Sequence, residues 1–262
     1  MFGRALTRTF WVFYDNLFKG LMLNVLLFFI YLPVFVFIFK THMFISIFIM
    51  LFIWHLTTPA VMHFWGKVIR QEDRKNVFLE LWEGIRFFSL KGAAMFLINC
   101  LAAYVVYISV IFYKSHSSNV FFAVLRGIGI WFAFTYLLMQ IFLFPIMVLD
   151  EKRRMLISYK KSLIMLVSAP FSSIGILAVI SYLMILLWPL VFGIGGPQAN
   201  GFLAGFMLFP VFLMPFLSLM FIMILQLNCA ILIYEKHKIM PDLKEAWEEK
   251  KWSNLFRPWE VK

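Results

Sequence analysis

Charged side chains are scarce in this sequence. Only 14% of the 262 residues are Asp, Glu, Lys or Arg, whereas 63% are hydrophobic. A typical soluble domain has about 25% charged and about 45–50% apolar residues. The shortage is most extreme between Ser162 and Tyr234, where the chain has no charged side chain at all. This composition excludes an ordinary soluble domain and indicates an integral membrane protein of the all-α class.

Cysteines and catalytic motifs are also nearly absent. The two cysteines, Cys100 and Cys229, lie in apolar runs without a partner at metal-ligand spacing, so neither a disulfide framework nor a zinc site is indicated. The sequence has no HExxH metal motif, no phosphate loop of the GxxxxGKS/T type, and no nucleophile with a plausible base beside it. We therefore expect no enzymatic activity, no cofactor and no bound metal.

Long apolar runs are what the sequence has in abundance. A membrane-crossing helix needs about 20 mainly apolar residues, and six segments reach that length. The last of them has 32 residues, and as a straight helix it would measure about 48 Å against a hydrocarbon core of about 30 Å. We expect it to bend at Pro210 and Pro215, because proline removes a backbone donor; a re-entrant first half is the alternative. The predicted spans are residues 21–39, 43–62, 93–112, 127–149, 174–192 and 202–233, with a turn at 193–201.

Lysine and arginine define the expected orientation. Basic residues accumulate in the cytoplasmic loops of membrane proteins, and with these spans 21 of the 24 Lys and Arg fall on one side, together with all 13 Asp and Glu. We therefore expect both termini in the cytoplasm, with one transmembrane domain over residues 1–234 and a charged cytoplasmic tail over 235–262. The net charge of +11 would then face anionic headgroups of the lipid bilayer, and no nucleic-acid partner is indicated.

Amphipathic segments are predicted before three of the spans, at residues 10–20, 76–88 and 155–166. In each, apolar side chains recur at helical spacing while charged ones fall elsewhere on the helix. We expect these helices to lie along the cytoplasmic membrane surface with their apolar faces down. The order predicts three repeated units, although charged linkers after every second span also occur in unrelated membrane proteins. The predicted apolar faces comprise Phe78, Leu81, Trp82, Ile85 and Phe88, and Leu156, Tyr159, Leu163 and Leu166, with Glu80, Glu83, Arg86, Lys160 and Lys161 on the polar sides.

Two stretches have a pattern seen in a known family. YDNLFKGLMLNVLLFFIYLPVF contains Asn24 in a first span that ends near Pro33, and LTTPAVMHFWGKVIRQEDRKNVFLELWEGIRFFSLKGAAMFLI leads from a Thr and small-residue turn into a charged helix. The chain thereby resembles the YesL-like family of small bacterial membrane proteins, with weaker similarity through residues 150–166 and the fifth span. It departs from the pattern in its longer C-terminal tail and in lacking a clear glycine-proline pair at the end of the first span.

The resemblance to the YesL-like family carries expectations about location and biological role. It implies a multi-pass helical protein of the bacterial cytoplasmic membrane, often associated with genes for carbohydrate uptake and degradation. It implies no molecular activity, because none is established for the family.

Polar side chains inside the predicted spans form one group of candidates. His55 is the one titratable group well inside a span, and ionisable groups in that position are costly and often functional. Amides in other spans could form hydrogen bonds between helices that stabilise the fold by about 0.6 kcal/mol each, and this structural interpretation is the simpler one. If they converged with His55, they would instead form a neutral polar site suited to hydroxyl-rich ligands. The candidates are Asn24, His55, Asn99, Gln140, Gln226 and Asn228.

Two functions from different classes fit these features. The first is an accessory or scaffold protein that docks a membrane or cytoplasmic protein partner. The second is a small permease, or a membrane subunit of a transporter. Carboxylates gain nothing from anionic headgroups, so we hypothesise that the acidic residues face a basic protein surface; pairing with the chain's own lysines is the alternative. The candidate docking residues are Glu80, Trp82, Glu83, Glu245, Glu248 and Glu249.

The topology makes a direct prediction for cysteine labelling in intact cells. Cysteines introduced at Lys114 and Gln198 should react with a membrane-impermeant maleimide from outside. Cysteines at Lys75 and Lys250 should react only after permeabilisation, because basic residues mark the cytoplasmic side. External labelling at Lys75 would contradict the assignment of six spans.

Overall fold

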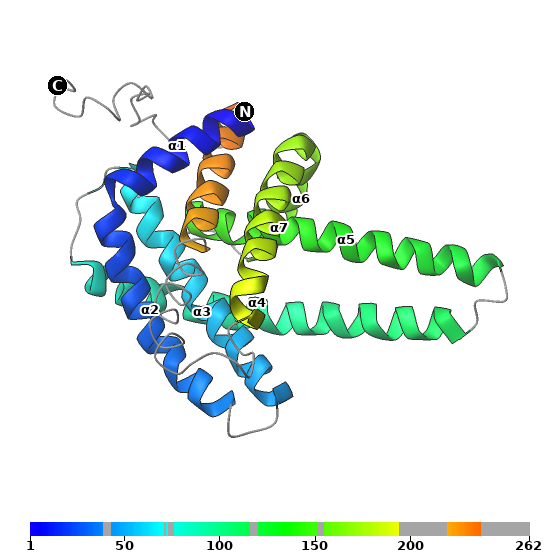
Figure 1. Cartoon of the computed structure of the whole chain (residues 1–262). Helices are drawn as coiled ribbons and strands as arrows, with labels where there is room; N and C mark the ends of the chain where they lie inside the picture. Colours follow the sequence, from blue (N-terminus) through cyan, green and yellow to red (C-terminus); the bar gives the residue numbers. More distant parts are fainter. Residues whose placement is uncertain are drawn as a thin grey trace. The chain divides into compact units, whose positions relative to one another are not determined.

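The computed structural model describes residues 1–38, 43–70, 72, 76–115, 120–150, 155–193 and 219–236. Within these ranges the regular structure consists of eight helices, which confirms the predicted all-α class (Figure 1). The helices are α1 (Phe2–Asp15), α2 (Leu17–Ile38), α3 (Met43–Arg70), α4 (Val77–Ser115), α5 (Val120–Leu149), α6 (Met155–Ser168), α7 (Pro170–Gly193) and a last helix, Leu219–Lys236.

The helices identify a multi-span integral membrane protein. Four helices of the described ranges are long and apolar enough to cross a bilayer: Phe48–Arg70 within α3, most of α4, all of α5, and the last helix. Two further pairs, α1 with α2 and α6 with α7, meet the same criterion only when each bent pair is counted as one span. The described residues therefore contain four to six candidate spans. The predicted turn after Gly193, the bends at Pro210 and Pro215, and the tail beyond Lys236 lie outside the described residues.

The chain divides into two compact units. Unit 1 comprises Met1–Leu26, Phe64–Val77 and Ala169–Lys262, and unit 2 comprises Leu27–His63 and Phe78–Ser168. The units alternate along the sequence, so α2 and α3 each contribute residues to both. The predicted boundary between residues 1–234 and 235–262 stays a prediction, because most of the tail is outside the described ranges.

Unit 1 packs around the last helix, most of whose residues are buried. Gly20 of α2 lies against the Trp65 ring and the Met220 sulfur, because glycine has no side chain to hold the helices apart. Gly175 of α7 similarly accommodates the ring of Phe2 from α1. These small residues let aromatic and sulfur-containing side chains fill the interior of the unit.

The amphipathic helix predicted at residues 10–20 is present, but it begins earlier and ends earlier. It is α1, and it stops at Asn16, whose side-chain nitrogen donates to the Val12 carbonyl at 3.0 Å. Asparagine competes well for backbone groups and so favours helix ends. The chain then turns by 80° into α2, as expected for a surface helix that leads into a span.

The charged segment before the third span differs from the prediction. Residues 77–88 of the predicted surface helix and all of 93–112 belong to one continuous helix, α4, of 39 residues, which corresponds to about 58 Å. The only helix-weakening residues near the expected break are glycines such as Gly92, and one glycine costs a helix only about 1 kcal/mol. A continuous helix cannot lie flat on the membrane at one end and cross it at the other. The charged segment is therefore a helical extension of the span.

Unit 2 contains a close crossing of α3 and α4. Pro59 has no backbone N–H, so the His55 carbonyl lacks its usual partner within the helix. Gly92 of α4 lies directly against that carbonyl oxygen, and a Cβ at Gly84 would come within 3.0 Å of the Ala60 Cα. A glycine Cα–H can point at a freed carbonyl and partly satisfy it. The pairing of 55 with 92 and 60 with 84 makes the two helices antiparallel.

Helices α4 and α5 run side by side as a long hairpin, which Figure 1 shows clearly. Near its far end the rings of Phe112 and Phe122 lie 6.2 Å apart, in an edge-to-face arrangement. Many apolar side chains along this part of the hairpin, such as Leu101 and Trp131, are more than 60% exposed. Apolar exposure of this extent is what a surface immersed in lipid requires.

Helix α6 packs against α5 through a face that the sequence pattern did not predict. Lys161, expected on the polar outer side, is buried and forms an ion pair with the Asp150 carboxylate at the end of α5. Leu156 and Leu163, from the predicted apolar stripe, are exposed as expected for lipid-facing residues. The position of Lys161 is therefore corrected: a buried ammonium needs a carboxylate nearby, and Asp150 provides one.

Substitution of Gly92 tests the crossing of α3 and α4. Gly92→Ala should lower the free energy of unfolding in detergent by about 1–3 kcal/mol, because the added Cβ would overlap the His55 carbonyl. Gly127→Ala in α5 is the matched control, since a Cβ there meets nothing within 4 Å. Equal stability of the two variants would mean that the helices do not approach so closely.

Candidate functional site

Three helices of unit 2 bring polar side chains together at one point. His55 of α3, Asn99 of α4 and Gln140 of α5 form a hydrogen-bonded group with Tyr136, which lies one turn before Gln140. Asn99 Nδ2 donates to His55 Nε2 at 2.9 Å and to Gln140 Oε1 at 3.3 Å. Asn99 Oδ1 accepts from Gln140 Nε2 at 3.2 Å and from the Tyr136 hydroxyl. We call these four residues the amide cluster.

Asn99 is the centre of the amide cluster. A carboxamide has two N–H donors and two acceptor positions on its oxygen. Asn99 uses all four of them, on His55, twice on Gln140, and on Tyr136. Its side chain therefore has no hydrogen-bonding position left for a ligand in this arrangement.

The same bonds assign the proton on His55. Its Nδ1 lies 2.7 Å from the Leu51 carbonyl oxygen, which can only accept, so Nδ1 carries the hydrogen. Its Nε2 faces an N–H of Asn99 and must therefore be the acceptor. The imidazole is thus neutral, protonated on Nδ1, and both of its nitrogens are hydrogen-bonded.

Aromatic rings enclose the histidine. The rings of Phe96 and Phe144 lie 5.4 Å and 5.7 Å from the imidazole centroid, and His55 is only 9% exposed. Such apolar surroundings strengthen hydrogen bonds that are made and raise the cost of those that are not. The hydrogen bonds of the cluster therefore hold α3, α4 and α5 firmly together at this point.

The remaining predicted amides lie in unit 1. Asn228 is fully buried and donates to the Thr9 hydroxyl at 3.0 Å, which in turn donates to the Ala5 carbonyl at 2.8 Å. Asn24 is 1% exposed, and neither of its amide atoms has a hydrogen-bond partner among the described residues. Gln226 is half-buried. The six predicted polar residues therefore divide into His55, Asn99 and Gln140 in one unit and these three in the other.

Tyr136 is the member of the cluster that sequence reasoning missed. A tyrosine in an aromatic-rich span gives little signal by itself, since tyrosine is frequent near membrane interfaces. Its spacing of four residues from Gln140 places both on one helix face. That spacing was the available clue.

The predicted docking residues of α4 separate into inward and outward positions. Glu80 is 0% exposed, so its expected place on an outer polar side is corrected. Leu81 is buried with it, whereas Trp82 is 60% exposed and Glu83 is exposed. The candidates Glu245, Glu248 and Glu249 lie outside the described residues. The exposed face of this segment comprises Phe78, Leu79, Trp82, Glu83, Arg86, Phe87 and Leu90, and we call it the outer face of α4.

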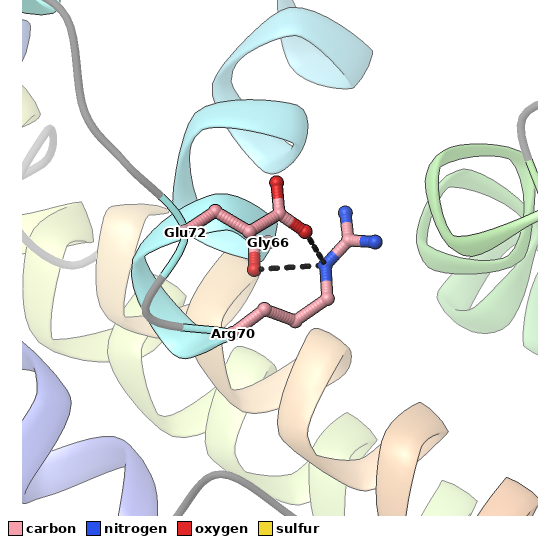
Figure 2. Close-up of polar contacts among 3 residues, drawn as sticks. All are labelled: Gly66, Arg70 and Glu72. Atoms are coloured by element: carbon pink, nitrogen blue, oxygen red, sulfur yellow. Dashed lines mark hydrogen bonds and ion pairs between the residues drawn. The ribbon is translucent and has the colours of Figure 1, made fainter. Parts of the chain in front are cut away.

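Some carboxylates pair with basic residues of the same chain. At the end of α3, Arg70 Nε lies 3.1 Å from a Glu72 carboxylate oxygen and donates to the Gly66 carbonyl at 3.3 Å, as Figure 2 shows. In unit 1 an Arg8 nitrogen lies 4.0 Å from a carboxylate oxygen of Glu235. With the buried pair of α5 and α6, these contacts place part of the acidic charge against the chain's own cations.

Comparison with known proteins adds no relative. A scan against protein-family models, a search of curated proteins and a search of solved structures each found no match to this chain. The resemblance to the YesL-like family therefore stays a prediction. Within the described ranges, no three His, Cys, Asp or Glu side chains gather as ligands of a metal ion would.

Removal of the central amide tests whether the cluster holds the helices together. Asn99→Ala should lower the free energy of unfolding by about 2 kcal/mol, since four hydrogen bonds within a membrane protein contribute about 0.6 kcal/mol each. Ser109→Ala on the same helix is the control and should change it by less than about 0.5 kcal/mol, because the exposed Ser109 hydroxyl bonds the Val105 carbonyl of its own helix. Similar losses in both variants would rule out a specific role for the cluster.

Proposed function

We infer that this protein is an accessory or scaffold protein of the membrane, whose amide cluster is a structural element. The observation that carries this inference is the saturation of Asn99 by three neighbouring side chains. A substrate site must offer donors or acceptors to its ligand. A cluster that satisfies itself offers few, and it is better suited to joining helices.

The outer face of α4 is the proposed docking surface for a protein partner. The segment continues a candidate span, and its basic neighbourhood favours a location at the cytoplasmic side of the membrane. The face combines exposed aromatic side chains, Trp82 among them, with Glu83 and Arg86. Aromatic residues and arginine are the side chains most enriched in the energetic centres of protein interfaces.

The proposed biological setting is carbohydrate uptake in the bacterial cytoplasmic membrane. This setting rests on the resemblance of residues 14–35 and 56–98 to the YesL-like family. An accessory role suits that setting, because a transporter complex can use a membrane subunit without its own catalytic residues.

A transport role is the second candidate, and one observation favours it. The Asn24 amide is buried in unit 1 without a hydrogen-bond partner among the described residues. A buried unsatisfied amide costs about 1–3 kcal/mol, and a bound polar ligand would remove that cost. A small permease, or a transporter subunit with a neutral polar site, would use Asn24 in this way.

Co-purification from native membranes tests the docking surface. The double variant Trp82→Ala, Glu83→Lys should reduce the yield of at least one protein that accompanies the wild type by about tenfold, as measured by quantitative mass spectrometry. Leu101→Ala, an exposed position further along α4, should leave all yields unchanged. Retention of every companion at the wild-type yield by the double variant would remove the support for an accessory role.

A further inference from the structure

The hydrogen bonds of the amide cluster can be satisfied in two opposite directions. We propose that His55 is a proton-binding site, and that protonation of its Nε2 reverses the donor and acceptor roles of Asn99, Gln140 and Tyr136 together. The inference goes beyond the proposed accessory function and is independent of the partner. It follows from the donors and acceptors of each side chain and from the distances between them.

When His55 is neutral, the donor and the acceptor of every hydrogen bond in the amide cluster are fixed. Because His55 Nδ1 donates to the Leu51 carbonyl, Nε2 has to accept from Asn99 Nδ2. This orientation of the Asn99 amide makes its oxygen the acceptor for Gln140 Nε2 and for the Tyr136 hydroxyl. The orientation of Gln140 is in turn set by the reciprocal amide pair.

A proton on Nε2 makes this arrangement impossible. Two N–H groups would then face each other across the 2.9 Å that separates His55 Nε2 from Asn99 Nδ2. Rotation of the Asn99 amide by half a turn places its oxygen against the new N–H. That rotation also forces Gln140 to rotate, since otherwise the two amides would meet nitrogen to nitrogen and oxygen to oxygen.

The reversed state satisfies as many bonds as the original. The imidazolium donates from both nitrogens, to the Leu51 carbonyl and to Asn99 Oδ1, and the amide pair is restored with its atoms exchanged. Asn99 Nδ2 now points at the Tyr136 oxygen, so this hydroxyl changes from donor to acceptor. Both states are therefore closed networks, and the bound proton selects between them.

The reversal continues toward α6. When the Tyr136 oxygen accepts from Asn99, its own O–H must find another acceptor. The hydroxyl of Tyr159 on α6 lies close enough to Tyr136 to interact with it. This hydroxyl is buried, and within the described residues it forms no hydrogen bond of acceptable geometry. A Tyr136 hydroxyl turned outward can donate to it. Protonation on α3 is thereby communicated through α4 and α5 to the amphipathic helix α6.

No charged group of the described structure competes for the proton on His55. Within the described residues the imidazole contacts Leu51, Phe96, Asn99 and Phe144, which carry no charge. Within the cluster and its described contacts the titratable groups are hydroxyls, Tyr136 on α5 and Tyr159 on α6, while the Tyr31 hydroxyl of α2 bonds Thr57 at 2.8 Å instead of His55. Other ionisable residues of the neighbouring helices, such as Cys100 and Lys91 on α4, have no described interaction with the imidazole.

Nitrogen NMR of the isotopically labelled protein in lipid vesicles tests the proposal by titration with acid. The His55 ring nitrogens, the side-chain amide nitrogens of Asn99 and Gln140, and the Tyr136 ring carbon that bears the hydroxyl should change with one shared midpoint. His55→Phe identifies the signals. The amide of Asn228, which bonds Thr9 in the other unit, is the control and should not follow that midpoint.

An isosteric variant tests whether position 99 faces Nε2 of His55, as the reversal requires. Asn99→Asp cannot donate to Nε2, and its carboxylate should stabilise the imidazolium and raise the His55 midpoint by about one to three pH units. The proposal is overturned if the amide signals stay constant while His55 titrates. It is equally overturned if His55 remains neutral down to the lowest pH at which the protein stays folded, or if its midpoint is unchanged in Asn99→Asp.

Discussion

The hydrogen bonds around Asn99 are the interaction on which unit 2 most depends. In the interior of a bilayer no water is available to replace a lost partner, so a polar side chain there must be satisfied by the protein itself. Asn99 solves this problem by bonding three side chains from two neighbouring helices. The same bonds set the rotation of α3, α4 and α5 relative to one another, which apolar packing among lipid-like side chains would leave poorly defined.

Backbone chemistry makes that arrangement possible. The proline at position 59 releases the carbonyl of His55, and the glycine at position 92 lets α4 approach it. His55 and Asn99 can reach each other because the two helices cross so closely beside the cluster. A bulky residue in place of Gly92 would separate the helices and leave the His55 imidazole and the Asn99 amide without partners. The hydrogen bonds of the cluster therefore depend on the close packing of the helices.

Some charged side chains form ion pairs within the chain, and others are exposed. The buried lysine of α6 meets the aspartate that follows α5, and Arg70 meets Glu72 just after α3. These contacts reduce the acidic charge that is available for a partner. The proposed docking surface for a protein partner is therefore the outer face of α4, where aromatic side chains lie beside Glu83. Recognition at that face would depend on aromatic burial at least as much as on acidity.

The amino-acid sequence by itself determined the class of protein, the existence of the helices and the presence of an amphipathic helix at residues 155–166. These are local properties, since length and apolar content are sufficient to specify a helix that can cross a bilayer. Even His55, Asn99 and Gln140 could be selected individually, because polar residues are conspicuous in apolar runs. Their convergence, with Tyr136, was decided by the tertiary structure.

Only the tertiary structure decided which way each helix faces. Periodicity assigned Glu80 and Lys161 to outer polar sides, yet both are buried, whereas Leu156 and Trp82, assigned to lipid-facing apolar sides, are exposed as expected. The physical reason is that a membrane protein is surrounded by lipid. In water an apolar stripe must point inward, but in lipid an apolar stripe can point outward at no cost, and the polar or small face is often the one that packs against the protein. Hydrophobic periodicity therefore locates such a helix without orienting it.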